Sequence, residues 1–132
     1  MKKTDYGIRR KLAIPYDRAV ARAKEVLQEQ GFGVLSEIDI KQKLKEKLNV
    51  DFKRYVILGA CNPPLAYKAL QAEPEIGLLL PCNVIVYELN EKSSMVSAID
   101  PNSMIDVIGE NRAVKEVARD ARTRLEKAIA SL

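Results

Sequence analysis

The stretch CNVIVYELNEKSSMVSAI, residues 82–99, predicts two β-strands and with them the kind of sheet the chain forms. The first strand is expected over Cys82–Leu89 and the second over Ser94–Ile99, because both segments are rich in the side chains that strands favour. The intervening Asn90–Ser93 suits a hairpin connection. These two strands are therefore expected to pair antiparallel.

The segments before this hairpin predict three more strands. Tyr6–Leu12 and Val34–Ile40 alternate between the two faces of a sheet, as half-buried strands do. Lys53–Cys61 is apolar throughout from Tyr55, which favours a central or doubly covered position. In the strand expected over Val34–Ile40, one face is formed by Val34, Ser36, Ile38 and Ile40, and the other by Glu37 and Asp39.

Helices are expected between these strands and after the last one. Apolar residues at helical spacing predict a helix from Pro15 to a cap at Gly31, and an amphipathic helix over about 110–131. Shorter helices are expected at Lys41–Leu48 and Leu65–Ala72. The apolar segment Glu73–Pro81 is expected to be an irregular connection.

This order of elements predicts an α+β fold with one antiparallel sheet covered by helices on one face. A chain of 132 residues fits a single domain over 1–132. Residues 1–5 are expected to form a flexible basic N-terminus.

The positive charge is concentrated at the start of the chain. The formal net charge is +4, and residues 1–12 hold five basic side chains against one acidic. The remaining 120 residues carry 17 basic and 17 acidic side chains, so the body of the protein is neutral. This distribution argues against nucleic-acid binding, which normally needs a basic face. Weak nucleic-acid binding is therefore a third hypothesis, after a dimeric ligand- or partner-binding module and after a thiol-dependent redox or soft-metal-handling protein.

The residue types that are missing restrict the chemistry. The chain has no histidine, which excludes Ser-His-Asp and Cys-His nucleophile pairs and histidine metal sites. No cofactor motif or catalytic constellation is recognisable, so we expect a protein that is non-enzymatic or only weakly catalytic. Neither a signal peptide nor an apolar run long enough to span a bilayer is found, so a cytoplasmic protein without membrane contact is expected.

The two cysteines mark the candidate site. Cys61 ends one expected strand and Cys82 begins the next, and an asparagine follows each. If the two strands are antiparallel neighbours, both Cys-Asn steps meet at one edge of the sheet. The site is therefore expected to contain Cys61, Asn62, Cys82 and Asn83.

Four interpretations of this site remain open. In the first, the thiols are simply packed in the core, which fits the usual burial of free cysteine. A helix N-terminus after Pro63 could instead stabilise a thiolate for redox chemistry. Cys61 and Cys82 could hold a soft metal, although two thiolates supply only half of a tetrahedral zinc site. Finally, the asparagine amides could fix a polar group of a small ligand in an apolar cleft.

An apolar segment beside this site predicts a subunit contact. Ile76, Leu78, Leu79 and Leu80 are too apolar for an ordinary exposed connection. A homodimer through or near these residues is expected, alongside an unidentified small ligand or protein partner.

Two stretches carry a resemblance to a known family. GACNPPLAYKAL, beginning at Gly59, and EIGLLLPCNVIVYE, ending at Glu88, resemble the signature of the uncharacterised prokaryotic family called domain of unknown function 302. The resemblance covers nearly the whole chain. It implies a fold like the TATA-binding-protein repeat, with β-α-β(4)-α order, and a small dimeric cytoplasmic protein. It brings no established activity. The family positions that match here are Cys61, Asn62, Pro63, Pro81 and Cys82, so the resemblance adds Pro63 and Pro81 to the expected site.

Overall fold

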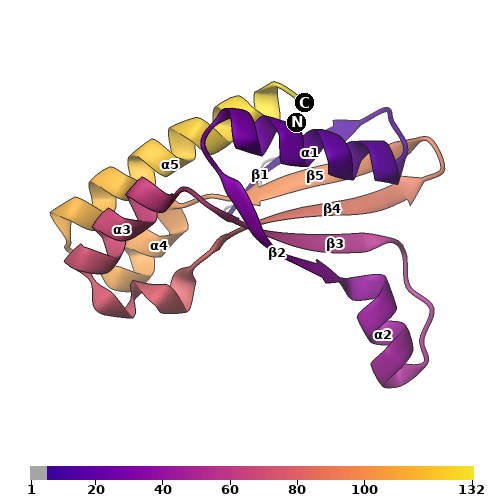
Figure 1. Ribbon diagram of the computed structural model, residues 1–132, viewed down its shortest axis with the longest axis horizontal. Helices are drawn as coiled ribbons and strands as arrows, with labels where there is room; N and C mark the ends of the chain where they lie inside the picture. The colour runs from indigo at the N-terminus through magenta and orange to yellow at the C-terminus, as the bar shows by residue number, and fades with distance from the viewer. Residues whose placement is uncertain (1–5) are drawn as a thin grey trace.

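The computed structural model describes residues 6–132, in which five strands form one antiparallel sheet (Figure 1). The expected flexible segment 1–5 lies outside the described residues. The strand order across the sheet is β1-β5-β4-β3-β2. The strands span β1 (Gly7–Leu12), β2 (Gly33–Asp39), β3 (Tyr55–Cys61), β4 (Cys82–Asn90) and β5 (Ser93–Ile99). The α+β class and the single antiparallel sheet are thus confirmed.

The central hairpin forms as its sequence predicts. Strands β4 and β5 pair antiparallel with Val86 opposite Val96 and Val84 opposite Ala98. All four side chains are buried, so this pair lies in the middle of the core. Removing such side chains from water stabilises the fold by about 1.5–3 kcal/mol for each large residue.

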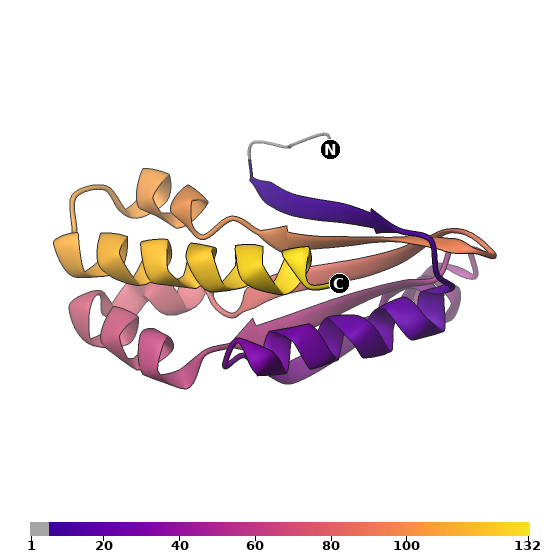
Figure 2. The ribbon, with the colours of Figure 1, turned by 90° about the horizontal axis from the view of Figure 1, so that it is seen from above.

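Two long helices cover one face of the sheet. Helices α1 (Tyr16–Glu29) and α5 (Arg112–Ala130) lie side by side over it (Figure 2). Apolar residues at helical spacing give each a buried stripe, which includes Val26 and Leu27 in α1 and Leu125 in α5. The predicted β-α-β(4)-α order is therefore present, with shorter helices inserted between strands. Likeness to the TATA-binding protein stays a prediction.

The opposite face of the sheet is uncovered by helices (Figure 1). We call it the open face. The strand registers and the alternation of side chains place on it Arg9, Lys11, Ile38, Tyr55, Ile57, Asn83, Ile85, Tyr87, Met95 and Ser97.

Helix α2 (Ile40–Leu48) stands apart from the helical layer and has no buried residue (Figure 1). An isolated helix of this length is marginal in water, so its ends matter. The Asp39 side chain accepts a hydrogen bond from the Gln42 N–H at 2.9 Å. At the other end Asn49 adopts the left-handed conformation, with φ of 54°, and closes the helix.

Three short helices gather beyond one end of the sheet. They are α3 (Pro63–Ala72), the 3-10 helix η1 (Pro74–Leu79) and α4 (Asn102–Ile108), and we call them the sheet-end group (Figures 1 and 2). Helices α3 and α4 pack against the overhanging half of α5, and η1 packs against α3. The expected irregular connection at Glu73–Pro81 is wrong, because η1 fills most of it. Helix α4 was not predicted.

The expected faces of β2 are wrong in two respects. A register shift between Val34 and Ser36 inserts an extra residue, so Val34 faces the helices while Ser36 and Ile38 lie on the open face. Ile40 is not in the strand but begins α2. The alternation rule fails here because a bulge adds one residue to one strand only.

Within residues 6–132, no helix has the length and apolar character that crossing a membrane requires.

Candidate ligand-binding site

The strand register brings the two cysteines to the same end of the sheet. Strands β3 and β4 are antiparallel neighbours with Ala60 opposite Cys82. Cys61 is the next residue along β3, so the last position of one strand lies beside the first position of the other. This is the arrangement that an antiparallel pairing requires.

Asn62 caps helix α3 from inside the protein. Its Oδ1 accepts a hydrogen bond from the Leu65 N–H at 3.3 Å, and the residue is buried. Pro63 can follow the cap because the first helical residue needs no N–H partner. Among residues 6–132 no acceptor bonds the amide nitrogen, Nδ2, so both of its N–H groups are free.

Gly31 makes room for this asparagine. Its φ of +83° is in the left-handed region, which favours glycine. A Cβ built at Gly31 would also lie only 3.0 Å from Asn62 Nδ2. The glycine that ends α1 therefore serves both the chain reversal and the placement of the cap of α3.

A small apolar cavity lies where these elements meet, and its volume is about 40 Å³. Four of the six predicted site residues line it: Cys61, Asn62, Pro81 and Cys82. Pro63 and Asn83 do not line it and are exposed. The rest of the wall is apolar and includes Phe32, Leu65, Ile76, Met104, Val114 and Ala118.

Burial controls the state of both thiols. Burial, with a smaller contribution from the neighbouring Cys61, raises the pKa of Cys82 to about 11. Burial also raises the pKa of Cys61. Both groups therefore stay protonated at neutral pH, whereas a reactive cysteine has a lowered pKa. The N-terminus of α3, expected to stabilise a thiolate, is capped by Asn62 instead.

A protein-held metal has little support in this arrangement. Residues 6–132 contain no group of three or more histidine, cysteine, aspartate or glutamate side chains that could hold an ion. Cys61 and Cys82 offer two sulfurs, and a structural zinc site needs four ligands.

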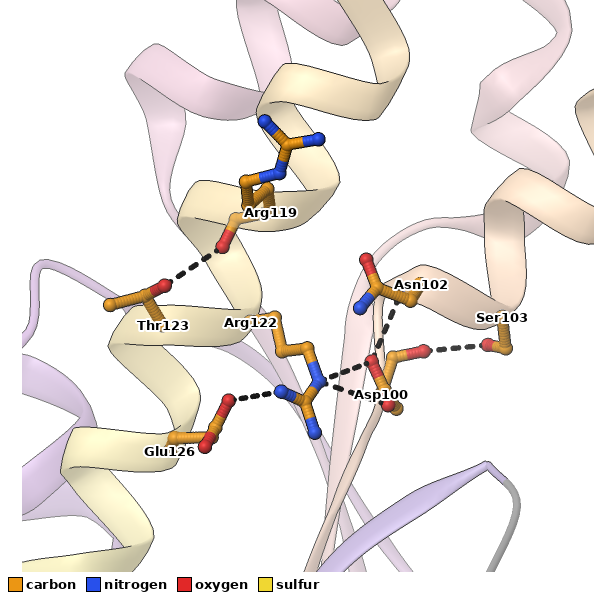
Figure 3. A network of polar contacts seen from close by, with 7 residues as sticks. All are labelled: Asp100, Asn102, Ser103, Arg119, Arg122, Thr123 and Glu126. Carbon is orange, nitrogen blue, oxygen red and sulfur yellow. Dashed lines mark hydrogen bonds and ion pairs between the residues drawn. The ribbon is translucent and has the colours of Figure 1, made fainter. Parts of the chain in front are cut away.

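The position of α4 beside the cavity is fixed by Asp100, just after β5. Arg122 Nε of α5 donates to the Asp100 carboxylate, at 3.2 Å from Oδ1 and 3.1 Å from Oδ2 (Figure 3). Oδ1 also accepts the Asn102 N–H at 2.9 Å, and the Asp100 carbonyl accepts from Ser103 Oγ at 2.7 Å. The hydrogen bond to Asp100 is the main reason why the pKa of Arg122 is raised.

This network is not predicted from the sequence. Asp100 lies in the turn that ends β5. Its ionic partner is 22 residues away, so no local pattern pairs the two. The wall residues contributed by α5 were likewise predicted only as part of an apolar stripe.

Together these features define a small α+β protein with one open-faced sheet and an apolar cavity at the end of that sheet. Residues 8–132 match the family model described as "Domain of unknown function DUF302", and the chain belongs to this family. A crystal structure of an uncharacterized conserved DUF302 protein from Bacillus stearothermophilus is similar to it. That protein shares 28% sequence identity and a TM-score of 0.85, over 96% of this chain and 98% of its own.

Among curated proteins, none matches the chain significantly. The family resemblance expected from the two Cys-Asn stretches is thus confirmed, and the comparisons supply no activity. The arrangement of residues is what supports a function.

Proposed function

We propose that the protein is a binding module whose small ligand occupies the sheet-end cavity. The observation that supports this is the convergence of Cys61, Asn62 and Cys82 on one apolar cavity. Ligand sites typically combine apolar walls with a few polar groups that fix orientation. The absence of histidine and of activated thiols agrees with binding rather than catalysis.

The cavity favours a compact, largely apolar ligand with one hydrogen-bond acceptor. A volume of about 40 Å³ holds a few heavy atoms, since one water needs roughly 10–15 Å³ by the same measure. The apolar side chains favour a hydrocarbon body. The free Nδ2 of Asn62 supplies a donor for a carbonyl or hydroxyl oxygen.

Larger ligands would require movement of the sheet-end group. Its α3 and α4 pack mainly against α5, and η1 packs against α3. They can therefore shift without disturbing the strand pairs. Because η1 and α4 contribute Ile76 and Met104 to the wall, such a shift would enlarge the cavity directly.

The test uses oxygen-containing probes of two to four heavy atoms, the size that the cavity holds: methanol, ethanol and acetone. We expect the methyl resonances of Ile76, Val114 and Val117, which line the cavity, to shift with saturation at millimolar probe. The methyl groups of Val26, which is a buried residue of α1 and does not line the cavity, serve as the internal control. Unchanged cavity resonances with all three probes would refute the proposal and leave only core packing.

A matched pair of variants separates binding from packing. Ala118→Leu fills the cavity from α5 and is expected to abolish the shifts at Val114 and Val117. Asn62→Ala is expected to lower the affinity for each of the three probes by about fivefold, because the amide donor is lost. The same substitution also removes the cap of α3. Asp39→Ala removes a cap far from the cavity and is expected to leave binding unchanged.

The dimer through the 76–80 segment also stays a proposal. Ile76 is buried inside the chain and lines the cavity, so it is not available as a surface contact. Leu78 is 82% exposed and is the side chain that supports a contact. Light scattering at micromolar concentration is expected to give a dimer mass that Leu78→Asp reduces to the monomer mass; a wild-type monomer would refute it.

A further inference from the structure

The sheet separates charge between its two faces, although the body of the protein is neutral. The five strands contain three acidic residues, Glu37, Asp39 and Glu88, and all three face the helices. Glu37 pairs with Lys24 of α1 at 2.8 Å. Glu88 pairs with Arg54, which also binds Asp17 of α1. Asp39 contributes with Glu37 to the raised pKa of Tyr16 in α1, which is due mainly to burial.

The open face carries basic side chains only, as far as the strands are concerned. Arg9 and Lys11 of β1 point away from the helices, as their partners Ser97 and Met95 do. Lys53, directly before β3, places its Nζ 5.4 Å from the ring centre of Tyr87, so it lies on the same face. None of these three cations has an ionic partner among residues 6–132.

Arg9 in particular has an unused donor. Its Nε is buried and has no hydrogen-bond partner within residues 6–132. No acceptor within residues 6–132 bonds the other guanidinium nitrogens of Arg9 either, so these N–H groups remain available to an anionic acceptor.

Aromatic rings lie between these cations. The cross-strand neighbours Tyr55 and Tyr87 stack with ring centres 5.4 Å apart and an angle of 7° between the planes. The ring centre of Phe52 lies 6.3 Å from that of Tyr55, and Phe52 is 40% exposed. The row Lys11, Met95, Tyr87, Tyr55 crosses four strands, which is roughly 14 Å at the usual strand spacing.

We propose that the open face binds single-stranded nucleic acid. Bases would stack on the rings of Tyr55 and Tyr87, and phosphates would bind Arg9, Lys11 and Lys53. Proteins that bind single strands without sequence preference combine cationic surfaces with aromatic side chains. The charge of this face complements a polyanion. This inference is independent of the cavity, which lies beyond the end of the sheet and is built mainly from helices.

A second copy of the chain is a poorer occupant of the same face. Packing two open faces together would bring six unpaired cations toward one interface with no acidic partner from the strands. Like charges in an interface are strongly unfavourable. The neutral charge of residues 13–132 argued against nucleic-acid binding, whereas the separation of charge between the two faces of the sheet favours it.

The probe is a fluorescein-labelled oligo(dT) of about 15 nucleotides, a length near the upper end of single-strand site sizes. Fluorescence anisotropy at low salt is expected to show saturable binding. Three phosphate contacts predict that log affinity falls with log salt with a slope near −2. No binding at low salt would overturn the proposal.

Charge-matched variants identify the face. Lys11→Glu is expected to weaken binding at least about fivefold and to reduce the salt slope by about one. Arg18→Glu changes the net charge equally but lies exposed on α1, and it is expected to leave the slope unchanged. Lys2→Gln with Lys3→Gln tests the terminal segment. Equal losses in all three would show non-specific attraction and would overturn the proposal.

A second pair of measurements tests stacking and the rival occupants. Tyr87→Leu is expected to lower the affinity for oligo(dT) by at least about fivefold. Circular dichroism checks that the variant is folded. If it is not folded, Tyr55→Leu is used in its place. A duplex of equal charge, or polyglutamate, is expected to compete at least about tenfold less well. Equal competition would overturn the proposal, as would a Tyr87-dependent dimer in sedimentation that excludes the oligonucleotide.

Discussion

The two faces of the sheet are made by the same five strands and differ in both burial and charge. On the helix side Leu58, Val86 and Val96 are fully buried and every acidic strand residue has a basic partner or a capping role. On the open face Arg9 and Lys11 are unpaired within residues 6–132 and the aromatic rings are partly exposed. The comparison teaches that alternation along a strand sorts charge as well as hydrophobicity, which a net charge conceals.

The largest expected effect compares two neighbours in β3 that point to opposite faces. Leu58→Ala should lower the free energy of unfolding by about 2–5 kcal/mol, because it leaves a cavity under the helices. Ile57→Ala on the open face should cost less than about 1.5 kcal/mol, since that side chain is only half-buried. Urea unfolding of both variants measures the difference. Equal losses would mean that something covers the open face in solution.

The second effect concerns pH and the thiol on the helix side. The ordinary thiol pKa of 9.0 describes the unfolded chain, and burial raises the pKa of Cys82 to about 11 in the fold. Below pH 9 the thiol is protonated in both states. From pH 9 to about 11 the unfolded chain releases a proton that the fold retains, so stability falls by roughly 2–3 kcal/mol.

Denaturant unfolding between pH 8 and 10 tests this slope. Cys82→Ala should flatten it, and Cys61→Ala, at a more exposed thiol, should flatten it less. The range stops at pH 10 because burial also raises the pKa of Tyr16, to about 12, and its ionisation in the unfolded chain would add a second loss above that pH. A wild-type protein with constant stability up to pH 10 would contradict the burial of Cys82.

The third effect compares a paired arginine with an unpaired one. The Arg122 and Asp100 side chains are 23% and 15% exposed, so Arg122→Ala should cost about 1–3 kcal/mol by leaving a half-buried carboxylate without its partner. Arg9→Ala should be close to neutral, because it removes a donor that has no acceptor within the described residues. Thermal unfolding gives both values. A large loss in Arg9→Ala would show that the open face already satisfies this group.

The sequence could predict the sheet and the meeting of Cys61 with Cys82, because alternation, the hairpin and antiparallel geometry are local or follow from strand order. It could not predict the bulge after Val34, because the alternation of residues over Val34–Ile40 is the same whether or not one residue is bulged out of the pairing with β3. Helix α4 was missed because its seven residues are too few to show a clear helical period. The pairing of Asp100 with Arg122 and the segregation of Glu37 from Arg9 depend on packing between distant segments, which no single stretch encodes.

The smallest expected effect concerns caps in covered and uncovered helices. Asn111 Oδ1 accepts the Val114 N–H at 3.2 Å, and its Nδ2 donates to the Ala72 carbonyl at 3.1 Å, so it joins α5 to α3. Asn111→Ala should lower global stability by about 1 kcal/mol. Asp39→Ala removes a similar cap from α2, which has no buried residue. Its cost should therefore appear in α2 alone, with under about 0.5 kcal/mol of global change.

Amide hydrogen exchange resolves the two cases. Protection should fall about fivefold in α2 when Asp39 is replaced, since a cap contributes about 1 kcal/mol to its own helix. Amides of β3 should keep their protection, because α2 opens without the sheet. If Asp39→Ala instead lowered protection in β3 and β4 as well, α2 would be coupled to the core. The contrast between a covered, cooperative side and an uncovered, independent one would then have to be abandoned.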